Sequence, residues 1–298
     1  MGGSINQNVL QDLKLDDPMG QLMDFSEERQ NIYLRRKSNK PQPWTDDKTL
    51  QTYKFCNVFR DQDRTTEFIL DWVSPLKNQS TDLVANLIYA RMCNNPRILE
   101  MMGFIHEIAP EKFIQNISMI GGGKTKSKVN KNTVWKDPYQ IAGAFKKRLG
   151  YPYREHVIAY HIPKTAADLT RSITNYTKQD LSELLDKMAD DWGYKNNMVF
   201  TNALLDISHI RPDLVSEDVI YPLGDGATPL LKLFDVDDPY EIINELVDRW
   251  NSKGIHRRMR PMDAESAMCE FRKYLVWKNS LAKKYRLFKP YPTQITLT

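Results

Sequence analysis

The sequence predicts a mainly α-helical fold with one small β-hairpin insertion. Most of the 298 residues lie in segments where apolar side chains recur every three or four positions, which is the spacing of a helix with one buried face. Hydrophobic residues make up 41% of the chain, enough for a sizeable core. The stretch around the glycines at 121–123 lacks helical periodicity, so we expect the hairpin there.

The first 43 residues are polar and mixed in charge, and they end in KSNKPQPW, where two prolines oppose regular structure. We therefore predict an N-terminal arm over residues 1–43. A single helical domain is expected over residues 44–290, followed by a tail at 291–298. Thr45 can cap a long helix that we predict to reach about Val73, because Ser74 and Pro75 follow.

Further helices are expected along the rest of the domain. Residues 113–120 look β-like, and together with the glycines and the polar stretch to residue 132 they predict a β-hairpin or glycine loop. The other predicted helices are 83–91, 96–102, a short one from Pro110, 138–149, 165–173, 178–189, 197–208, 238–250 and 264–281.

Cysteine usage and the N-terminus bear on the compartment. Cys56, Cys93 and Cys269 are far apart and form no CxxC pair, which favours a reducing environment. The N-terminus lacks the basic start and apolar core of a signal peptide, and no run reaches membrane-spanning length. We expect a cytoplasmic protein with no membrane partner. The five histidines form no pair at i,i+3 or i,i+4, so we predict neither a metal site nor a cofactor.

The net charge of +4 is too small to indicate a nucleic-acid partner, but the charges are unevenly distributed. One basic block contains Lys126 and Lys128, and another contains Arg257 and Arg258, while acids collect elsewhere. These four residues are candidates for contacts to DNA phosphates. A solvated lysine-rich surface explains the same pattern equally well.

The most distinctive local feature is the segment NVFRDQDR at residues 57–64, where charged residues interrupt an apolar pattern. On one continuous helix, Arg60, Asp63, Arg64 and Glu67 would share a stripe through spacings of three and four. Such a stripe can bind phosphate, because guanidinium groups match phosphate oxygens. A surface network of ion pairs is the alternative.

The segment SMIGGGKT at residues 118–125 resembles a phosphate-binding P-loop with Ser in place of the first glycine. A P-loop leads into a helix, but the lysine- and asparagine-rich stretch that follows has no apolar face, so a nucleotide kinase is disfavoured. Gly122, Gly123 and Lys124 could still approach a phosphate closely. A flexible hairpin tip is the competing interpretation.

Four segments in this order resemble the alpha-glutamyl/putrescinyl thymine pyrophosphorylase family, which includes phage amino acid:DNA transferases. They are NVFRDQDR, MIGGGK at 119–124, GDGA at 224–227 and CEFRKY at 269–274. The same helical unit occurs in hydroxymethyl-deoxyuridine DNA kinases. The resemblance implies a fold similar to helix-hairpin-helix DNA glycosylases and DNA containing modified thymine as substrate. Two positions depart from the family pattern, Asp225 and Arg272.

The family chemistry replaces a phosphate or pyrophosphate on the exocyclic methylene of 5-hydroxymethyluracil with the amine of an amino acid or polyamine. The resemblance makes Arg60, Arg64 and Lys124 candidates for stabilising the leaving group. Asp61, Asp63 or Asp206 could accept the proton of the incoming ammonium. The remaining candidates are Lys273 for phosphate binding and, as supporting residues, Glu67, Asn202 and Glu270.

Two alternatives stay open at this point. The chain could be a noncatalytic DNA-binding module that assists a hydroxymethyluracil DNA kinase acting upstream. It could also be a DNA glycosylase that removes the base, given the implied fold and Asp206.

Overall fold

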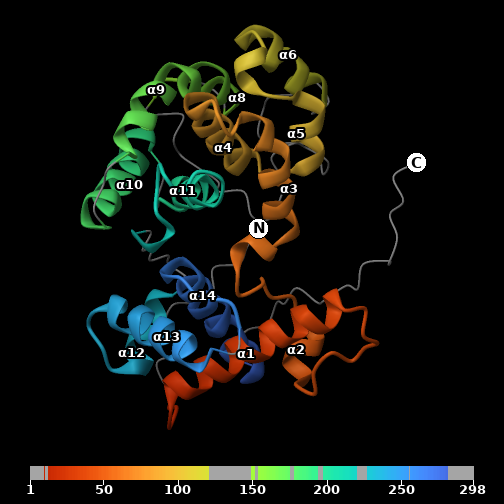
Figure 1. Ribbon diagram of the computed structural model, residues 1–298, viewed down its shortest axis with the longest axis vertical. Coiled ribbons are helices and arrows are strands. Elements are labelled where there is room, and N and C mark those ends of the chain that lie inside the picture. The colour runs from red at the N-terminus through yellow and green to blue at the C-terminus, as the bar shows by residue number, and fades with distance from the viewer. Residues whose placement is uncertain are drawn as a thin grey trace. The chain divides into compact units, whose positions relative to one another are not determined.

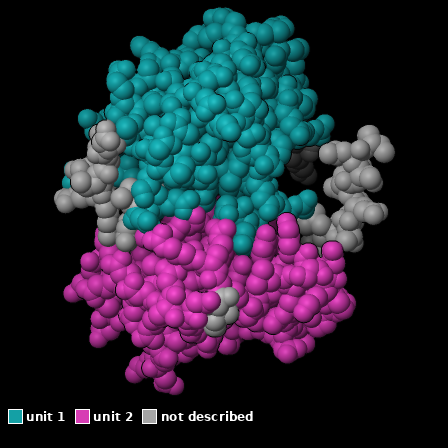
Figure 2. Space-filling view, viewed as in Figure 1, with its two compact units in different colours: residues 1, 61–222 teal, residues 2–60, 223–298 magenta. Residues whose placement is uncertain are grey.

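The computed structural model describes Leu10 and residues 13–120, 149–151, 154–174, 178–193, 197–219, 227–254 and 256–280. These residues form helices and no β-strand, which confirms the prediction of a mainly α fold (Figure 1). The sequence predicts one domain over residues 44–290, whereas the contacts divide the chain into two compact units (Figure 2). Unit 1 comprises residues 1 and 61–222, and unit 2 comprises residues 2–60 and 223–298.

Unit 2 begins with α1 (Pro18–Lys37), so the expectation of an irregular arm over residues 1–43 is wrong for this segment. The side chain of Asp17 caps the helix by accepting a hydrogen bond from the Gly20 amide at 2.9 Å, and Pro18 takes the first helical position. One face of α1, which includes Leu22 and Phe25, is buried. The predicted tail at 291–298 lies outside the described residues.

The long helix expected over residues 45–73 is also wrong, because it consists of separate pieces. Helix α2 (Lys48–Thr52) is capped by Asp47 and ends where Tyr53 adopts extended backbone angles. A 3-10 turn, η2 (Arg60–Gln62), follows, and helix α3 (Arg64–Val73) starts after Asp63, whose φ of −78° and ψ of 131° are extended. The β-region backbone of Asp63 therefore separates Arg60 from the helix that carries Arg64 and Glu67.

The centre of unit 2 is α14 (Pro261–Lys278), which packs against α1, α2 and α13 (Pro239–Lys253). Its aromatic residue Phe271 lies with Phe25 of α1 in a ring cluster, with centroids 5.6 Å apart. The short helices η7 (Thr228–Leu230) and α12 (Leu231–Phe234) complete the described part of this unit. Gly254 ends α13 with a φ of 61°, a left-handed conformation that glycine adopts without strain.

In unit 1, helix α4 (Ser80–Cys93) is central and packs against α3, α9 and α11 (Figure 1). Eleven of its residues are buried, so it has no exposed stripe, as expected of a helix covered on all sides. The other helical elements of the unit are η3 (Ser74–Leu76), α5 (Pro96–Met102), η4 (Ile105–Glu107), α6 (Pro110–Ile120), α8 (Arg154–His156), a π-helical turn (Val157–His161), α9 (Ile162–Ser172), α10 (Lys178–Trp192), α11 (Met198–Ile210) and η6 (Glu217–Val219).

The β-like reading of residues 113–120 is wrong, because these residues belong to helix α6. Phe113 and Ile117, four residues apart, are its buried positions, so the spacing of the apolar residues is that of a helix. The glycines and the polar stretch of the predicted hairpin lie outside the described residues, as does nearly all of the helix predicted at 138–149.

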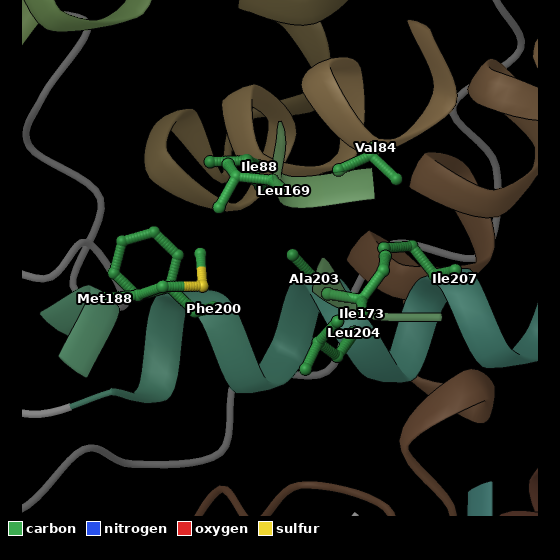
Figure 3. Close-up of a pocket in the computed structure, with 9 residues that line it drawn as sticks. All are labelled: Val84, Ile88, Leu169, Ile173, Met188, Phe200, Ala203, Leu204 and Ile207. Atoms are coloured by element: carbon green, nitrogen blue, oxygen red, sulfur yellow. The ribbon is translucent and has the colours of Figure 1, made fainter. Parts of the chain in front are cut away.

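The helices predicted at 83–91, 96–102, 165–173, 178–189, 197–208, 238–250 and 264–281 are confirmed, with ends shifted by a few residues. Within unit 1, side chains of α4, α9, α10 and α11 point toward one another around a cavity of about 10 Å³ (Figure 3). Val84, Ile88, Phe200 and Leu204 are among its lining residues, all of which are apolar. A space of this size and polarity holds at most one water molecule and no substrate. Across the residue ranges that the structure describes, no helix has the length and apolar character needed to cross a lipid bilayer.

Candidate functional site

Unit 1 contains a buried pair of opposite charges, Arg91 of α4 and Asp206 of α11. Arg91 donates from Nε to Asp206 Oδ2 at 2.5 Å and from Nη2 to Asp206 Oδ1 at 2.6 Å, so the two groups meet side by side. The Arg91 side chain is 6% exposed and that of Asp206 is not exposed at all. Charges withdrawn from water in this way need a partner of good geometry, and each supplies it for the other.

The pair exists because α4 and α11 pack along their length. Arg91 lies in the last turn of α4, and Asp206 lies in the middle of α11, among Leu205, Ile207 and other buried residues. Arg91 Nη2 also donates to Thr66 Oγ1 of α3 at 3.0 Å. Three helices thus meet at one guanidinium group.

Several predicted candidates surround the start of α3. Asp63 precedes the helix without capping it through its side chain, Arg64 is the first helical residue and exposed, and Glu67 lies in the first turn. Thr66, which contacts Arg91, is in the same turn and buried. The structure therefore brings Asp206 to the turn that carries Arg64 and Glu67, through Arg91 and Thr66.

The other two charged candidates of the segment lie in η2. Arg60 is its first residue and is counted with unit 2, whereas Asp61 is counted with unit 1. Both are partly exposed. The predicted single stripe from Arg60 to Glu67 is wrong, since Asp63 interrupts the helix between them.

Asn202 lies one turn before Asp206 on α11. Its side-chain amide donates to the Met198 carbonyl at 2.7 Å, a hydrogen bond within its own helix. Gly122, Gly123, Lys124, Lys126 and Lys128, the candidates from the glycine-rich stretch, lie outside the described residues.

Unit 2 contains a second buried charged cluster, formed by Glu270 and Lys273 of α14. Lys273 donates to Glu270 Oε1, and the backbone amide of Cys56 donates to Glu270 Oε2 at 3.0 Å. Arg29 of α1 donates to the carbonyls of Phe55 and Cys56 at 3.2 and 3.0 Å. The cluster thus joins α1, α14 and the extended segment before η2.

This environment changes the pKa of both charged groups of α14. Burial acts to raise the pKa of Glu270, but Lys273 and the Cys56 amide outweigh it and hold that pKa below its ordinary value. Burial acts to lower the pKa of Lys273, but Glu270 beside it raises the pKa above the ordinary lysine value. Lys273 is therefore a paired cation, and its predicted role in phosphate binding would compete with Glu270.

Cys269 lies next to this cluster in the sequence. Burial and then the neighbouring Glu270 raise the pKa of its thiol to about 12. A thiol that stays protonated at neutral pH is a poor nucleophile, so Cys269 does not suit covalent catalysis.

The candidates for DNA contact, Arg257 and Arg258, lie in the short connection between α13 and α14, and both are exposed. The guanidinium of Arg257 lies 4.1 Å from the ring centroid of the buried Phe59. A cation held over a ring keeps its charge while losing freedom, which suits a fixed surface contact. In the described ranges, no group of three or more His, Cys, Asp or Glu residues is placed to hold a metal ion.

Sequence reasoning identified Asp206 but missed its partners Arg91 and Thr66, and it missed Arg29 in unit 2. A signal for Arg91 was present, because it is the one charged residue in the mainly apolar segment LVANLIYARMC at 83–93. Buried charges are rare unless paired, so such a residue predicts a buried partner, although not which one.

Comparison with known proteins places these observations in a family. Residues 18–282 match the family model described as "5-hmdU DNA kinase, helical domain". The chain belongs to this family. The match covers both units and includes every candidate residue named above.

One curated relative of the chain is the 5-hmdU DNA kinase of Bacillus phage SP10, which is 38% identical over 91 residues. The aligned part is 29% of this chain and 14% of the phage protein, so the chain matches only a small share of that relative's length. No solved structure matches the chain. The shared helical domain is thereby confirmed, whereas membership of the thymine pyrophosphorylases and the glycosylase-like fold stay predictions.

Proposed function

We propose that the chain is a DNA-base transferase, which replaces the phosphate or pyrophosphate of an activated 5-hydroxymethyluracil in DNA with an amine. Membership of the helical-domain family supports the substrate class. The observation that carries the enzymatic part is the buried Arg91–Asp206 pair beside Arg64 and Thr66. Burying two charges is costly compared with packing apolar groups, so a domain that served only as a scaffold gains little from it.

In the proposed reaction, the bond between the exocyclic carbon of the base and the ester oxygen breaks, and a bond from that carbon to the amine nitrogen forms. The phosphate or pyrophosphate leaves with the electron pair of the broken bond. The incoming amine loses a proton, which must pass to a base. The site therefore needs cations for the leaving group and a carboxylate for the proton.

The residues at the start of α3 suit these two needs. Arg64 would stabilise the negative charge of the leaving group, and Arg60 is the other arginine that the sequence proposes for this role. Asp206 is occupied by Arg91, so the proposal gives it a positioning role. Asp61 or Asp63 would then accept the proton of the amine, which is an amino acid or a polyamine.

A base inside a duplex is out of reach of any side chain, so the target nucleotide must leave the stack, at a cost of a few kcal/mol. The exposed Arg257 and Arg258, with the lysines at 126 and 128, would hold the backbone phosphates. A hydroxymethyluracil DNA kinase acting beforehand would supply the phosphorylated base. The proposed location is the cytoplasm.

The direct test is incubation of the protein with DNA that contains phosphorylated or pyrophosphorylated hydroxymethyluracil, together with amino acids and polyamines. The DNA is then digested and the nucleosides are analysed by mass spectrometry. A nucleoside carrying an amine in place of the phosphate is expected. If no amine yields an adduct with either substrate, the transferase proposal is wrong.

Arg60→Ala is expected to lower the transfer rate at least tenfold with the helix content preserved, because a stabilising cation is lost. Arg97→Ala is the matched control, since Arg97 is an exposed arginine near the start of α5. It should leave the rate unchanged. Equal rates for both variants would assign Arg60 to a surface ion-pair network.

The second candidate function is a noncatalytic DNA-binding module that assists a kinase. It is favoured by the family itself, which is named for one domain of a kinase. Binding to DNA that weakens steeply with salt, without any product, would support this module. Abasic sites in the same digest would instead indicate a glycosylase.

A further inference from the structure

The guanidinium group of Arg91 is only partly used by its partners. Nε donates to Asp206, and Nη2 donates to both Asp206 and Thr66, so their three hydrogens are all engaged. The third nitrogen, Nη1, has two hydrogens and makes no hydrogen bond to any described residue. It lies at the end of the group that faces away from the carboxylate, because Asp206 occupies the Nε–Nη2 edge.

The Arg91 side chain keeps a small accessible area, 6% of its full exposure. Nη1 is not among the seven fully buried side-chain atoms without a partner in the described residues. Arg91 as a whole is 7% exposed, so its accessible area is small. Arg91 is therefore a recessed cation with two unused N–H groups, rather than a cation on an open face.

The first turn of α3 lies beside this guanidinium group, because Thr66, its third residue, contacts Nη2. The helix has ten residues, and the side chain of Asp63 does not cap it. The amide groups of a helix start attract anions. Arg64, exposed at the first position, adds a positive charge.

We infer that Arg91 Nη1 and the first turn of α3 form a binding site for a terminal phosphoryl group, with Asp206 and Thr66 holding the guanidinium in place. Arg91 and Asp206 together are neutral, so binding comes from directed N–H donors rather than from net charge. A recessed donor suits a phosphoryl group that projects from its carrier. Backbone phosphates of a duplex are better matched by exposed arrays of cations.

The inference depends on the proposed function only for the molecule that carries the phosphoryl group, which would be the activated base. Arg91 would then contact the leaving group directly. Asp206 and Thr66 would be positioning residues, since they act through Arg91.

The test uses the full chain and inorganic pyrophosphate as the probe. In a nitrogen-15 NMR titration of the wild-type protein, the side-chain signal of Arg91, assigned by its loss in Arg91→Lys, should shift in a saturable manner. By calorimetry, Arg91→Lys should weaken pyrophosphate binding roughly tenfold or more, because lysine keeps the charge but cannot hold the fork geometry. Thr66→Val, which removes only the hydroxyl, should weaken it less.

Arg260→Lys is the matched control. Arg260 also pairs with a fully buried carboxylate, Asp263, but within one turn at the start of α14 in unit 2. This variant should bind pyrophosphate as the wild type does. If Arg91→Lys does not fold, the NMR titration of the wild type decides by itself, with the signal assigned through Thr66→Val.

Two results would overturn the inference. One is an Arg91 signal that stays unchanged at saturating pyrophosphate, and the other is equal binding by wild type and Arg91→Lys. If the first result is found and the Arg91 signal shifts instead with a short unmodified duplex, the site binds backbone phosphate. Pyrophosphate binding that depends on Arg91 without any transfer would sink the proposed function and leave this inference standing.

Discussion

Replacing Asp206 by Asn tests whether the buried pair with Arg91 contributes more to stability than an exposed ion pair does. The side chain of Asp206 is not exposed and accepts two hydrogen bonds from Arg91, at 2.5 and 2.6 Å. Asparagine keeps the shape but leaves the guanidinium without its counter-charge in a site that is 6% exposed. Breaking a buried pair in this way costs about 3–5 kcal/mol, so unit 1 should lose a large part of an ordinary stability margin of about 5–15 kcal/mol.

The assay is urea denaturation followed by circular dichroism, with hydrogen exchange of α4 and α11 as the local measurement. Asp213→Asn provides the matched control in the same unit. Asp213 pairs with Arg211 through the same two-bond geometry, at 2.7 and 2.5 Å, but its side chain is 61% exposed. Exposed pairs contribute about 0–1 kcal/mol, so this variant should change little.

A double-mutant cycle with Arg91→Met measures the coupling between the two charges. Combining Arg91→Met with Asp206→Leu should restore much of the loss, because apolar residues of similar volume can replace a buried pair. The reasoning is refuted if Asp206→Asn costs no more than Asp213→Asn and the exchange of α4 is unchanged.

Three further predictions concern charge and pH. Glu270→Gln should destabilise unit 2 by about 1–3 kcal/mol at neutral pH, since it removes the charge that pairs with Lys273. The pKa of Glu270 is held low, so the stability that its charge contributes is present above the ordinary value of 4.5 and is lost as the pH falls through the folded-state value. Urea titrations at pH 7 and pH 3 should therefore show a smaller difference in unfolding free energy between wild type and Glu270→Gln at the lower pH. Burial and then Lys164 lower the pKa of His161. Below the ordinary value of 6.5 the folded protein therefore binds fewer protons than the unfolded chain, so its stability should fall as the pH drops through this window. An NMR titration that gives His161 a pKa of 6.5 or higher would contradict this. Replacing Arg257 and Arg258 by Gln should weaken binding to any duplex and reduce the slope of log affinity against log salt by about one per lost phosphate contact. The slope is measured by fluorescence anisotropy. An unchanged slope would show that neither arginine contacts a DNA phosphate.

The sequence predicted most of the helices because their signals are local. Caps, prolines at helix starts and a spacing of three to four apolar residues all lie within one segment, and α9, α10, α11, α13 and α14 appear where these signals place them. The same signals were present for α1, where Asp17 and Pro18 precede the helix, but the polar composition of the first 43 residues obscured them. Residues 113–120 were misread because a short apolar run fits a strand or a helix equally well.

The candidate site was predicted only in part. Asp206, Arg64, Glu270 and Lys273 were named from the sequence, and the last two pair because they are three positions apart on one helix. The break at Asp63 was not predicted. The extended backbone of this residue changes which charges share a face, so the predicted stripe does not form.

The sequence by itself determined the helical class, the family and the types of charged residue available for chemistry, since these depend on composition and short-range order. Only the tertiary structure decided which charges meet. Arg91 and Asp206 are 115 residues apart, and the Cys56 amide and Glu270 are 214 apart. A buried charge takes its partner from whatever helix packs beside it, and that packing follows from the whole core rather than from neighbouring residues in the chain.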